Sequence, residues 1–215
     1  MTQKSKSMIV RFKILQVALN EFANYSYEKS SINRICTEGN ISKGVMYHHF
    51  KDKDELYLLC IRYCYETMLD YYKTQLKDSE DWREEIKNFL NIKYHFFNEN
   101  PLLHRIFFNT LFRMPEHLKE EIKKITRSLD DLNYEFSMKI LKKIKIRHGL
   151  KPEEIIFLLD AVQNMLNEKF YGKAQGSEEI EKLSQEYDKT AEKWIDVMLY
   201  GIIERDEKNS DENLM

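Results

Sequence analysis

The segment ISKGVMYHHF, residues 41–50, gathers hydrogen-bonding and basic side chains into a stretch short enough for a single small helix. Met46 and Phe50 are four residues apart and predict a buried face, since residues at this spacing lie one above the other on a helix. Two outward rows remain, Lys43 with Tyr47 and Gly44 with His48. Such a face suits the major groove of DNA, where small and basic residues reach phosphates and base edges. It equally suits a tight helical corner whose polar face is simply solvated.

Start and stop signals predict the elements that position this face. They give a first helix over about 8–24, a second that begins at Ser30 or Ser31 and ends before Gly39–Asn40, a third capped by Ser42, and a fourth from Asp52 or Lys53. A short helix, a turn of about three residues and a second short helix have the proportions of a helix-turn-helix. The positive N-terminal ends of these helices, at Ser30–Ser31, Ser42 and Lys53, are places where a phosphate could bind.

The composition favours an all-α protein. Of 215 residues 42% are hydrophobic, which is enough for a core, whereas six glycines and three prolines leave little material for the turns of a sheet. Longer helices are expected over about 81–98, 101–112, 115–147, 152–171 and 178–203, and each proline falls at a helix start. The tail after Glu204 is charged and expected to fray.

The charge is unevenly distributed. Residues 1–53 contain nine Lys or Arg and four acids, so this segment carries +5 within a chain whose net charge is -2. A basic end on an acidic body indicates contact with a polyanion through that end. The three cysteines do not predict a disulfide framework, and the longest unbroken apolar run, Ile155–Leu159, is far shorter than the roughly 20 residues of a membrane span. We therefore expect a soluble cytoplasmic protein without a membrane partner.

Residues 14–56 resemble the N-terminal DNA-binding domain of the TetR family of transcriptional regulators. The positions that carry the resemblance are Ile14, Leu15, Ala18, Phe22, Ser30, Ser31, Ile32, Ile35, Ile41, Ser42, Gly44, Met46, Tyr47, Phe50, Lys53 and Leu56. Two positions depart from the family pattern. Ser26 replaces the glycine usual before the second helix, and Asn40 replaces the glycine usual in the turn. Since Asn tolerates the left-handed conformation, we expect the turn to survive.

The resemblance implies a site and a domain plan. Ser30, Ser31 and Lys53 would hold phosphates, Ser42 would cap the third helix beside the DNA, and the groove would be faced by Lys43, Gly44, Val45, Tyr47 and His48. A three-helix helix-turn-helix head (1–52) would be joined by the fourth helix to a larger ligand-binding and dimerisation bundle (53–205), about nine helices in all. A flexible tail (206–215) would follow.

The resemblance also implies a small-molecule effector site and a two-fold interface in the bundle. Aromatic residues with interleaved polar groups predict an apolar chamber lined by Phe97, His104, Phe107, Phe108, Phe112, Met114, Tyr134, Met138 and Asn164. Apolar stripes on the last two helices predict a homodimer interface made by Ile155, Leu158, Leu159, Val162, Leu166, Tyr187, Ala191, Trp194 and Met198. In both cases the same residues would equally serve as ordinary core.

Motifs for an enzyme are missing. No histidine has a Glu three residues before it, as a di-iron bundle requires, and neither the zinc-hydrolase spacing nor a Gly-x-Ser-x-Gly elbow occurs. Cys60 and Cys64 share a helix face but have no third ligand nearby, so a buried pair is favoured over a metal site. We therefore expect no catalytic residues, metal or cofactor. The chain is expected to be a ligand-responsive regulator, and specifically a repressor, that binds a palindromic operator in double-stranded DNA as a homodimer. The alternative is a helical small-molecule-binding protein or enzyme without DNA binding.

Overall fold

The computed structural model describes residues 3–173 and 177–203, and this part of the chain is helical, as the sequence predicts. The expected tail, residues 206–215, lies outside the described residues. The described elements in chain order are α1 (Gln3–Asn24), α2 (Ile32–Glu38), α3 (Lys43–His49), α4 (Lys53–Gln75), α5 (Trp82–Glu99), α6 (Pro101–Phe112), the 3-10 helix η1 (Glu116–Leu118), α7 (Lys119–Lys143), α8 (Pro152–Phe170) and α9 (Ser177–Ile202).

Two of the expected boundaries are wrong. The first helix begins at Gln3, several residues before the predicted start, because residues 3–7 are compatible with helix although they have no core to cover. The helix expected over 115–147 is divided into η1 and α7 and ends at Lys143. The chain then turns, and Ile146 pairs with Ile203 in an isolated antiparallel bridge that ties the α7–α8 connection to the end of α9.

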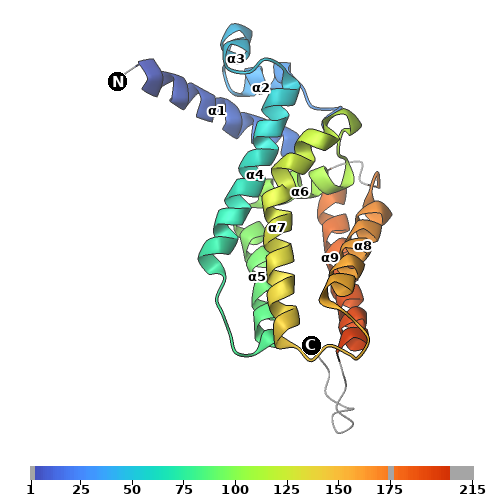
Figure 1. The fold of residues 1–215 in the computed structure, drawn as a ribbon. Helices are drawn as coiled ribbons and strands as arrows, with labels where there is room; N and C mark the ends of the chain where they lie inside the picture. The colour runs from blue at the N-terminus through green and yellow to red at the C-terminus, as the bar shows by residue number, and fades with distance from the viewer. Residues whose placement is uncertain (1–2, 174–176, 204–215) are drawn as a thin grey trace.

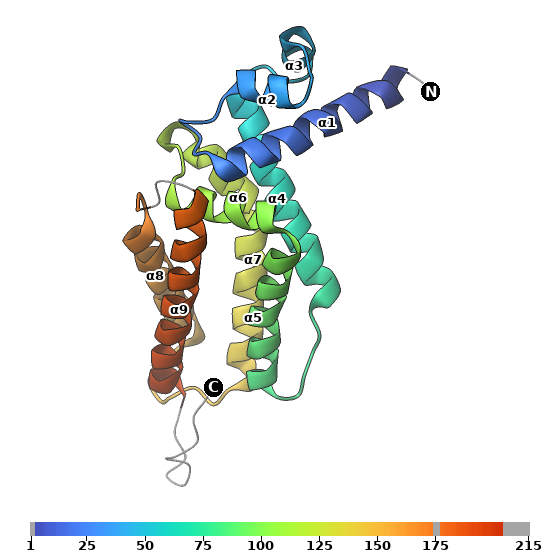
Figure 2. The same ribbon diagram turned by 180° about the vertical axis from the view of Figure 1, so that it is seen from behind.

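The helices form a small head on a longer bundle (Figures 1 and 2). Helices α1, α2 and α3 gather at one end, and α3 lies farthest from the bundle. Helix α4 begins in the head and runs down the bundle, while α6 crosses beneath α1. Helices α4 and α6 therefore each contact both the head and the bundle.

Local capping sets the start of the head helices. Ser31 accepts a hydrogen bond from the Arg34 amide, Ser42 from the Val45 amide, and Asp52 from the Glu55 amide, so α2, α3 and α4 each start with a side-chain cap. The turn between α2 and α3 contains Asn40 at φ 47°, the left-handed conformation that the sequence predicts for this Asn.

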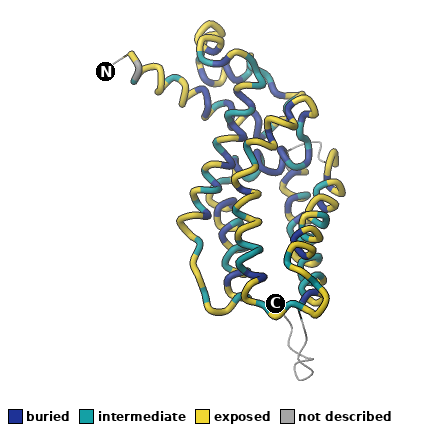
Figure 3. The backbone as a smooth tube through the Cα atoms, in the orientation of Figure 1, coloured by how far each residue is buried: buried dark blue, intermediate teal, exposed yellow. Residues whose placement is uncertain are grey.

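Burial follows the same plan (Figure 3). One hydrophobic cluster runs without interruption from the head into the bundle, from Ile14 and Phe22 on α1 through Leu56 and Cys60 on α4 to Phe108 on α6. A second, smaller cluster closes the far end of the bundle and consists of Leu141, Ile155, Ile156 and Ile202. Because the larger cluster crosses the head–bundle junction, the two parts pack against each other through apolar contacts.

A buried carboxylate fastens the far end of α4 and α5 to α7. The Glu85 side chain is 1% exposed, and its Oε1 lies 2.9 Å from the Nζ atoms of both Lys139 and Lys143. The Ser79 amide donates to the same oxygen at 2.9 Å, and Lys143 Nζ donates to the Ser79 carbonyl at 2.6 Å. Two ammonium groups and one carboxylate thus hold the α4–α5 loop against α7. We call these four residues the Glu85 clasp.

Candidate nucleic-acid interface

Helix α3 presents the polar face that its sequence predicts. Met46 and Phe50 are each 1% exposed and belong to the main core. The side chains of Tyr47 and Val45 are 54% and 40% exposed, and the remaining residues with a place on the outer face, Lys43, Gly44 and His48, are exposed as well. The structure therefore brings together, on one outward surface at the end of the molecule, all five residues expected to face a DNA groove.

Gly44 is not required by the packing of α3. A Cβ built at this position meets only Ser42 Oγ, at 4.0 Å, which is ordinary contact. By contrast, a Cβ at Gly39 would lie 2.6 Å from Ile41 Cδ1, so that glycine does serve the turn. Because nothing in the fold demands a glycine at 44, its use is consistent with a need for another molecule to approach the helix backbone.

The C-terminal end of α3 is held by α1. Arg11 Nη1 donates to the His49 carbonyl at 3.1 Å, and the guanidinium lies 4.5 Å from the centre of the Phe50 ring. At the other end, the Ile41 amide donates to the Cys36 carbonyl at 2.8 Å, which joins α3 to α2. Hydrogen bonds thus tie this short helix to α1 at its end and, through Ile41 just before its start, to α2.

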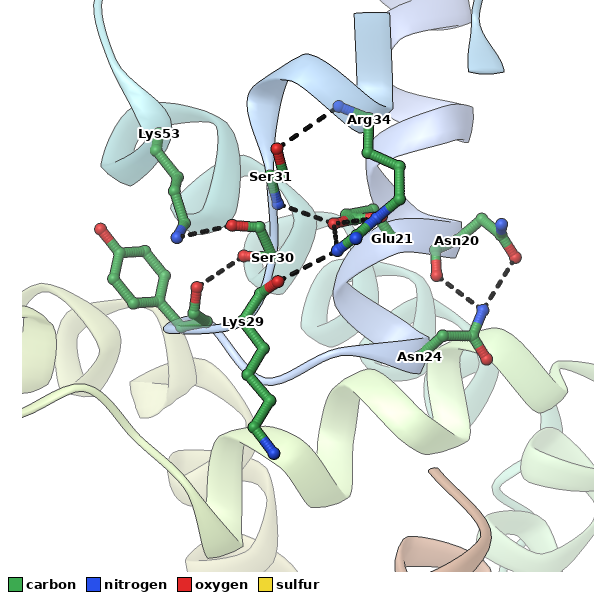
Figure 4. Close-up of polar contacts among 9 residues, drawn as sticks. Asn20, Glu21, Asn24, Lys29, Ser30, Ser31, Arg34 and Lys53 are labelled. Carbon is green, nitrogen blue, oxygen red and sulfur yellow. Dashed lines mark hydrogen bonds and ion pairs between the residues drawn. The ribbon is translucent and has the colours of Figure 1, made fainter. Parts of the chain in front are cut away.

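An internal ion pair connects α1 to α2 (Figure 4). Glu21 is 1% exposed, and its carboxylate accepts from Arg34 Nη2 at 2.6 Å and from the Ser31 amide at 2.7 Å. Arg34 also donates to the Lys29 carbonyl at 3.0 Å and covers the Tyr25 ring at 3.9 Å. The Glu21 hydrogen bond raises the pKa of Arg34. Since Glu21 already occupies the amide at the start of α2, this end of the helix is less open to a phosphate than the sequence suggests.

Ser30 does not present its hydroxyl to solvent. It is 7% exposed, and its Oγ donates to the Tyr27 carbonyl at 2.6 Å. The expectation that Ser30 holds a phosphate is therefore at odds with its position, because tertiary packing turns the hydroxyl inward. Ser31 remains partly exposed, with its hydroxyl used as the α2 cap.

Lys53 is partly buried beneath the same loop. Its Nζ donates to the Ser30 carbonyl at 3.0 Å and lies 4.2 Å from the Tyr27 ring centre (Figure 4). Burial lowers the pKa of Lys53, although neighbouring carboxylates, Glu28 foremost, oppose the change. In this arrangement the lysine holds the α1–α2 loop against the start of α4. A phosphate that bound Lys53 would therefore have to share its ammonium group with the Ser30 carbonyl.

The residues that hold the head together were not found from the sequence. Arg11, Glu21 and Arg34 belong to no motif, and their partners are distant along the chain. One signal was available for Glu21. It lies beside Ala18 and Phe22 on the core side of an amphipathic helix, and a charged residue on a buried face predicts a partner of opposite charge.

The expected effector chamber is only partly assembled. Phe97, Phe107, Phe108 and Phe112 are buried and contact one another, with ring centres 5.1 to 5.8 Å apart, and Phe108 and Phe112 also contact Tyr187. His104 joins this aromatic cluster, 4.9 Å from the Phe108 ring centre, and burial lowers its pKa. Three expected lining residues lie elsewhere. Tyr134 and Asn164 are exposed, and Met138 packs against the second core cluster.

Two surface depressions adjoin this part of the bundle. One, of about 300 Å³, lies between the α1–α2 loop and the ends of α6 and α8, and its lining includes Phe112, Met114 and Tyr171. The other, of about 290 Å³, lies between α4 and α5 and is lined by residues that include Tyr71, Ile92 and His95. Only the first contains residues of the expected chamber.

The expected dimer stripe divides between the inside and the outside of the protomer. Ile155, Leu166 and Tyr187 are at most 4% exposed, so assigning them to the interface is wrong for this fold. Leu159, Val162, Ala191, Trp194 and Met198 are half-buried, and Leu158 is 46% exposed. The outer faces of α8 and α9 carry other apolar residues instead. Phe157 is 72% exposed, Met165 60% and Val197 63%. Helix α8 is apolar on two sides, and the stripe predicted from periodicity falls mostly on the inner one.

The cysteines fit the expected buried pair. Cys60 and Cys64 are inaccessible to solvent, burial raises the pKa of both thiols, and Cys64 Sγ donates to the Leu103 carbonyl at 3.4 Å. Over residues 3–173 and 177–203, no three His, Cys, Asp or Glu side chains are grouped so that they could hold a metal ion. None of the helices in these ranges is both long and apolar enough to cross a membrane.

Comparison with known proteins places the head within a family. Residues 14–60 match the family described as "Bacterial regulatory proteins, tetR family". The chain is similar to the HTH-type transcriptional regulator YuxN of Bacillus subtilis (strain 168), with 26% identity over 71% of this chain, and it spans about half of that relative (52%). It is also 24% identical, over 68% of its length and 76% of the relative, to IcaR of Staphylococcus epidermidis, a negative transcriptional regulator of the biofilm operon icaADBC.

The fold is likewise similar to solved structures. A TetR family transcriptional regulator from Chloroflexus aurantiacus superposes with a TM-score of 0.59 and 24% identity, covering 92% of this chain and 95% of that one. The similarity extends over head and bundle alike, so the arrangement of the bundle helices has a precedent as well as that of the head.

Proposed function

Since the chain is a transcriptional regulator of the TetR family, we propose that it binds an operator in double-stranded DNA as a homodimer through the outer face of α3. The observation that carries this proposal is the exposure of Lys43, Gly44 and Tyr47 on a helix at the tip of the molecule, anchored behind by Met46 and Phe50. Repression is the sense of regulation that we propose, because IcaR is named as a negative regulator.

The groups on this face match the chemistry of a groove. Lys43 and His48 offer donors to phosphates or guanine edges, Tyr47 offers a hydroxyl to a phosphate, and Val45 offers an apolar contact to a thymine methyl group. The alternative of a solvated helical corner explains the exposure of Val45 and Tyr47 less well, because apolar surface left in water does not stabilise the protein. The alternative of a bundle protein without DNA binding leaves this face without a role.

We propose that dimerisation uses the outer faces of α8 and α9. A palindromic operator needs two heads that reach half-sites about 34 to 36 Å apart, which one protomer cannot supply. Phe157, Leu158 and Met165 on α8 and Val197 on α9 present apolar surface on the side of the bundle away from its core. Two copies of this helix pair would bury these residues in a four-helix contact with two-fold symmetry.

An effector would act from within the bundle. The aromatic cluster consists mainly of side chains of α6, and the depression at Phe112 and Met114 borders both this cluster and the α1–α2 loop. An apolar small molecule with a few polar groups suits such surroundings. It would shift the separation of the two heads only to the extent that it binds one arrangement more tightly than the other.

The test begins with selection of genomic DNA fragments by the purified full-length chain, followed by fluorescence anisotropy on the selected duplex at several salt concentrations. We expect binding that weakens steeply with salt and a loss of about 5- to 150-fold in Tyr47→Ala, in keeping with about 1 to 3 kcal/mol for a groove or phosphate contact. Tyr134→Ala is the matched control, since Tyr134 is 52% exposed on α7, far from the head. Equal affinity of both variants and the wild type, or absence of salt-dependent DNA binding, would overturn the proposal.

A further inference from the structure

The N-terminal half of α1 extends beyond the rest of the head. None of the side chains described between residues 3 and 13 is buried, whereas Ile14 and every core residue of α1 after it lie in the main cluster. Figures 1 and 2 show this half projecting as a rod beside the head, held near its middle by Val10 against the main cluster, and both views place its end at the level of α2 and α3, at the end of the molecule away from the bundle. A surface that met α3 would therefore also pass close to this rod.

The projecting segment is basic. Residues 3–20 contain Lys4, Lys6, Arg11 and Lys13 and no acidic residue, and the first acid of the chain is Glu21. Lys6 and Lys13 are exposed and seven residues apart, so they share one face of the helix. We call residues 3–13 the basic arm.

A polar contact joins the basic arm to α3. Arg11 donates to the carbonyl of His49, the last residue of α3, at 3.1 Å, and lies against the Phe50 ring. The arm therefore starts where the candidate groove-reading helix ends. From Arg11 to Gln3 an α-helix extends about 12 Å, and this length corresponds to about three or four base pairs of B-DNA.

We propose that the basic arm is a second DNA-binding element, which lies along the phosphate backbone outside the base pairs that α3 reads, with Lys6 and Lys13 neutralising flanking phosphates. This inference rests on the proposed operator binding and adds to it a contact that depends on DNA length and not on base sequence. Phosphate contacts of this kind contribute affinity and fix the position of the protein without specifying bases.

A second copy of the chain is the competing occupant. Met8, Ile9 and Phe12 are 65%, 53% and 57% exposed, and Met8 and Phe12 lie on a different face from the two lysines. Two arms packed through these residues would bring eight positive charges together with no acid among them, which opposes self-association. DNA supplies the opposite charge, so the charge pattern favours it.

The experiment measures the salt dependence of operator binding for the full-length wild type and for Lys6→Ala/Lys13→Ala. On a duplex that extends at least six base pairs beyond the selected site, we expect the slope of log affinity against log salt to become shallower by about 1 to 2 in the double variant. The affinity advantage of the wild type should accordingly shrink by about tenfold between 50 and 200 mM salt. On a duplex trimmed to the site, the two proteins should bind alike. Lys6→Glu/Lys13→Glu should enlarge the difference on the long duplex.

The matched control is Lys73→Ala/Lys87→Ala, which removes two exposed lysines from the bundle and should bind as the wild type does on both duplexes. An unchanged slope in the arm variant, with normal binding by the wild type, would overturn the basic arm and leave the operator proposal intact. A change of oligomeric state in Met8→Ser/Phe12→Ser, measured by sedimentation without DNA, would assign the arm to a second copy and also overturn it. If the wild type shows no salt-dependent binding, the operator proposal itself fails.

Discussion

The side-chain amide of Asn109 on α6 donates a hydrogen bond of 3.1 Å to the carbonyl oxygen of Phe22 near the end of α1. A second, longer contact of 3.3 Å reaches the Ala23 carbonyl. Carbonyl groups in the last turn of a helix have no partner within the helix, so Asn109 satisfies groups that would otherwise be buried without one. Its own Oδ1 is buried without a hydrogen-bond partner, which costs free energy. The two hydrogen bonds that the amide donates offset this cost. Helix α6 is thereby fastened to the main chain of the head.

Asn109→Leu should lower the free energy of unfolding by about 1 to 3 kcal/mol, because it leaves buried carbonyls unpaired while nearly preserving volume. The measurement is urea unfolding followed by circular dichroism. Asn133→Ala, at an exposed position of α7, is the control and should change stability by less than about 0.5 kcal/mol. Equal midpoints for Asn109→Leu and wild type would show that the contact contributes nothing to the fold.

Gly44→Ala should change stability and DNA binding in opposite directions. Alanine favours helix over glycine by up to about 1 kcal/mol, and a Cβ at this position meets no close neighbour, so the protein should become slightly more stable. Operator binding should weaken, because the added methyl group keeps the backbone of α3 away from the DNA.

Gly201→Ala is the control for that experiment. Gly201 is also helical and open to an added Cβ, but it lies at the end of α9, so stability should rise here without any change in affinity. If Gly44→Ala binds the operator as tightly as the wild type does, the close approach of α3 through its glycine is wrong.

The Glu85 clasp should make the stability of the fold depend on pH. Burial opposes ionisation of Glu85, but hydrogen bonds from Lys143, the Ser79 amide and Lys139 outweigh it and lower the pKa to about 2. Because the folded-state pKa lies below the ordinary value of 4.5, the stabilisation is complete above pH 4.5 and is lost as the pH falls toward 2.

The difference in unfolding free energy between wild type and Glu85→Gln should therefore shrink as the pH is lowered from 6 through this window. Guanidinium unfolding at successive pH values measures it. Glu121→Gln, at an exposed position of α7, should show no such convergence. A constant difference between wild type and Glu85→Gln would mean that the carboxylate is not held ionised by its partners.

Phe157→Glu combined with Met165→Glu should convert the proposed homodimer into a monomer, because two charges would enter an apolar contact. Sedimentation velocity reports the oligomeric state, and the same sample should lose most of its affinity for a two-half-site operator. Tyr94→Glu is the control, since Tyr94 is 64% exposed on α5 and lies outside the proposed interface. A double variant that still sediments as a dimer would show that the interface does not involve this face of α8.

Local signals in the sequence were sufficient for most helix boundaries. Caps such as Ser42 and Asp52, and prolines at the starts of α6 and α8, act within one turn and can be recognised without knowing the fold. The first residues of α1 were not predicted to be helical because they show no apolar periodicity. Its residues are helical without covering any core.

Properties that depend on distant residues were not accessible in the same way. The direction of the Ser30 hydroxyl is set by Tyr27, and periodicity cannot say which of two apolar faces of α8 points inward. The chamber residues were grouped by their aromatic character, yet Tyr134 and Met138 face away from Phe108, since α7 presents several faces to different neighbours. The outward residues of α3 could be predicted because they all lie on one short helix whose buried pair, Met46 and Phe50, fixes its rotation.

The exposed apolar surface of Phe157 and Met165 has a consequence for regulation in the cell. If reading the operator requires two protomers to associate first, occupancy of the promoter rises roughly with the square of the copy number while the protein is scarce. A modest change in synthesis or degradation would then switch the target gene over a narrow range. In this way an apolar patch on α8, far from α3, would set the threshold at which transcription responds.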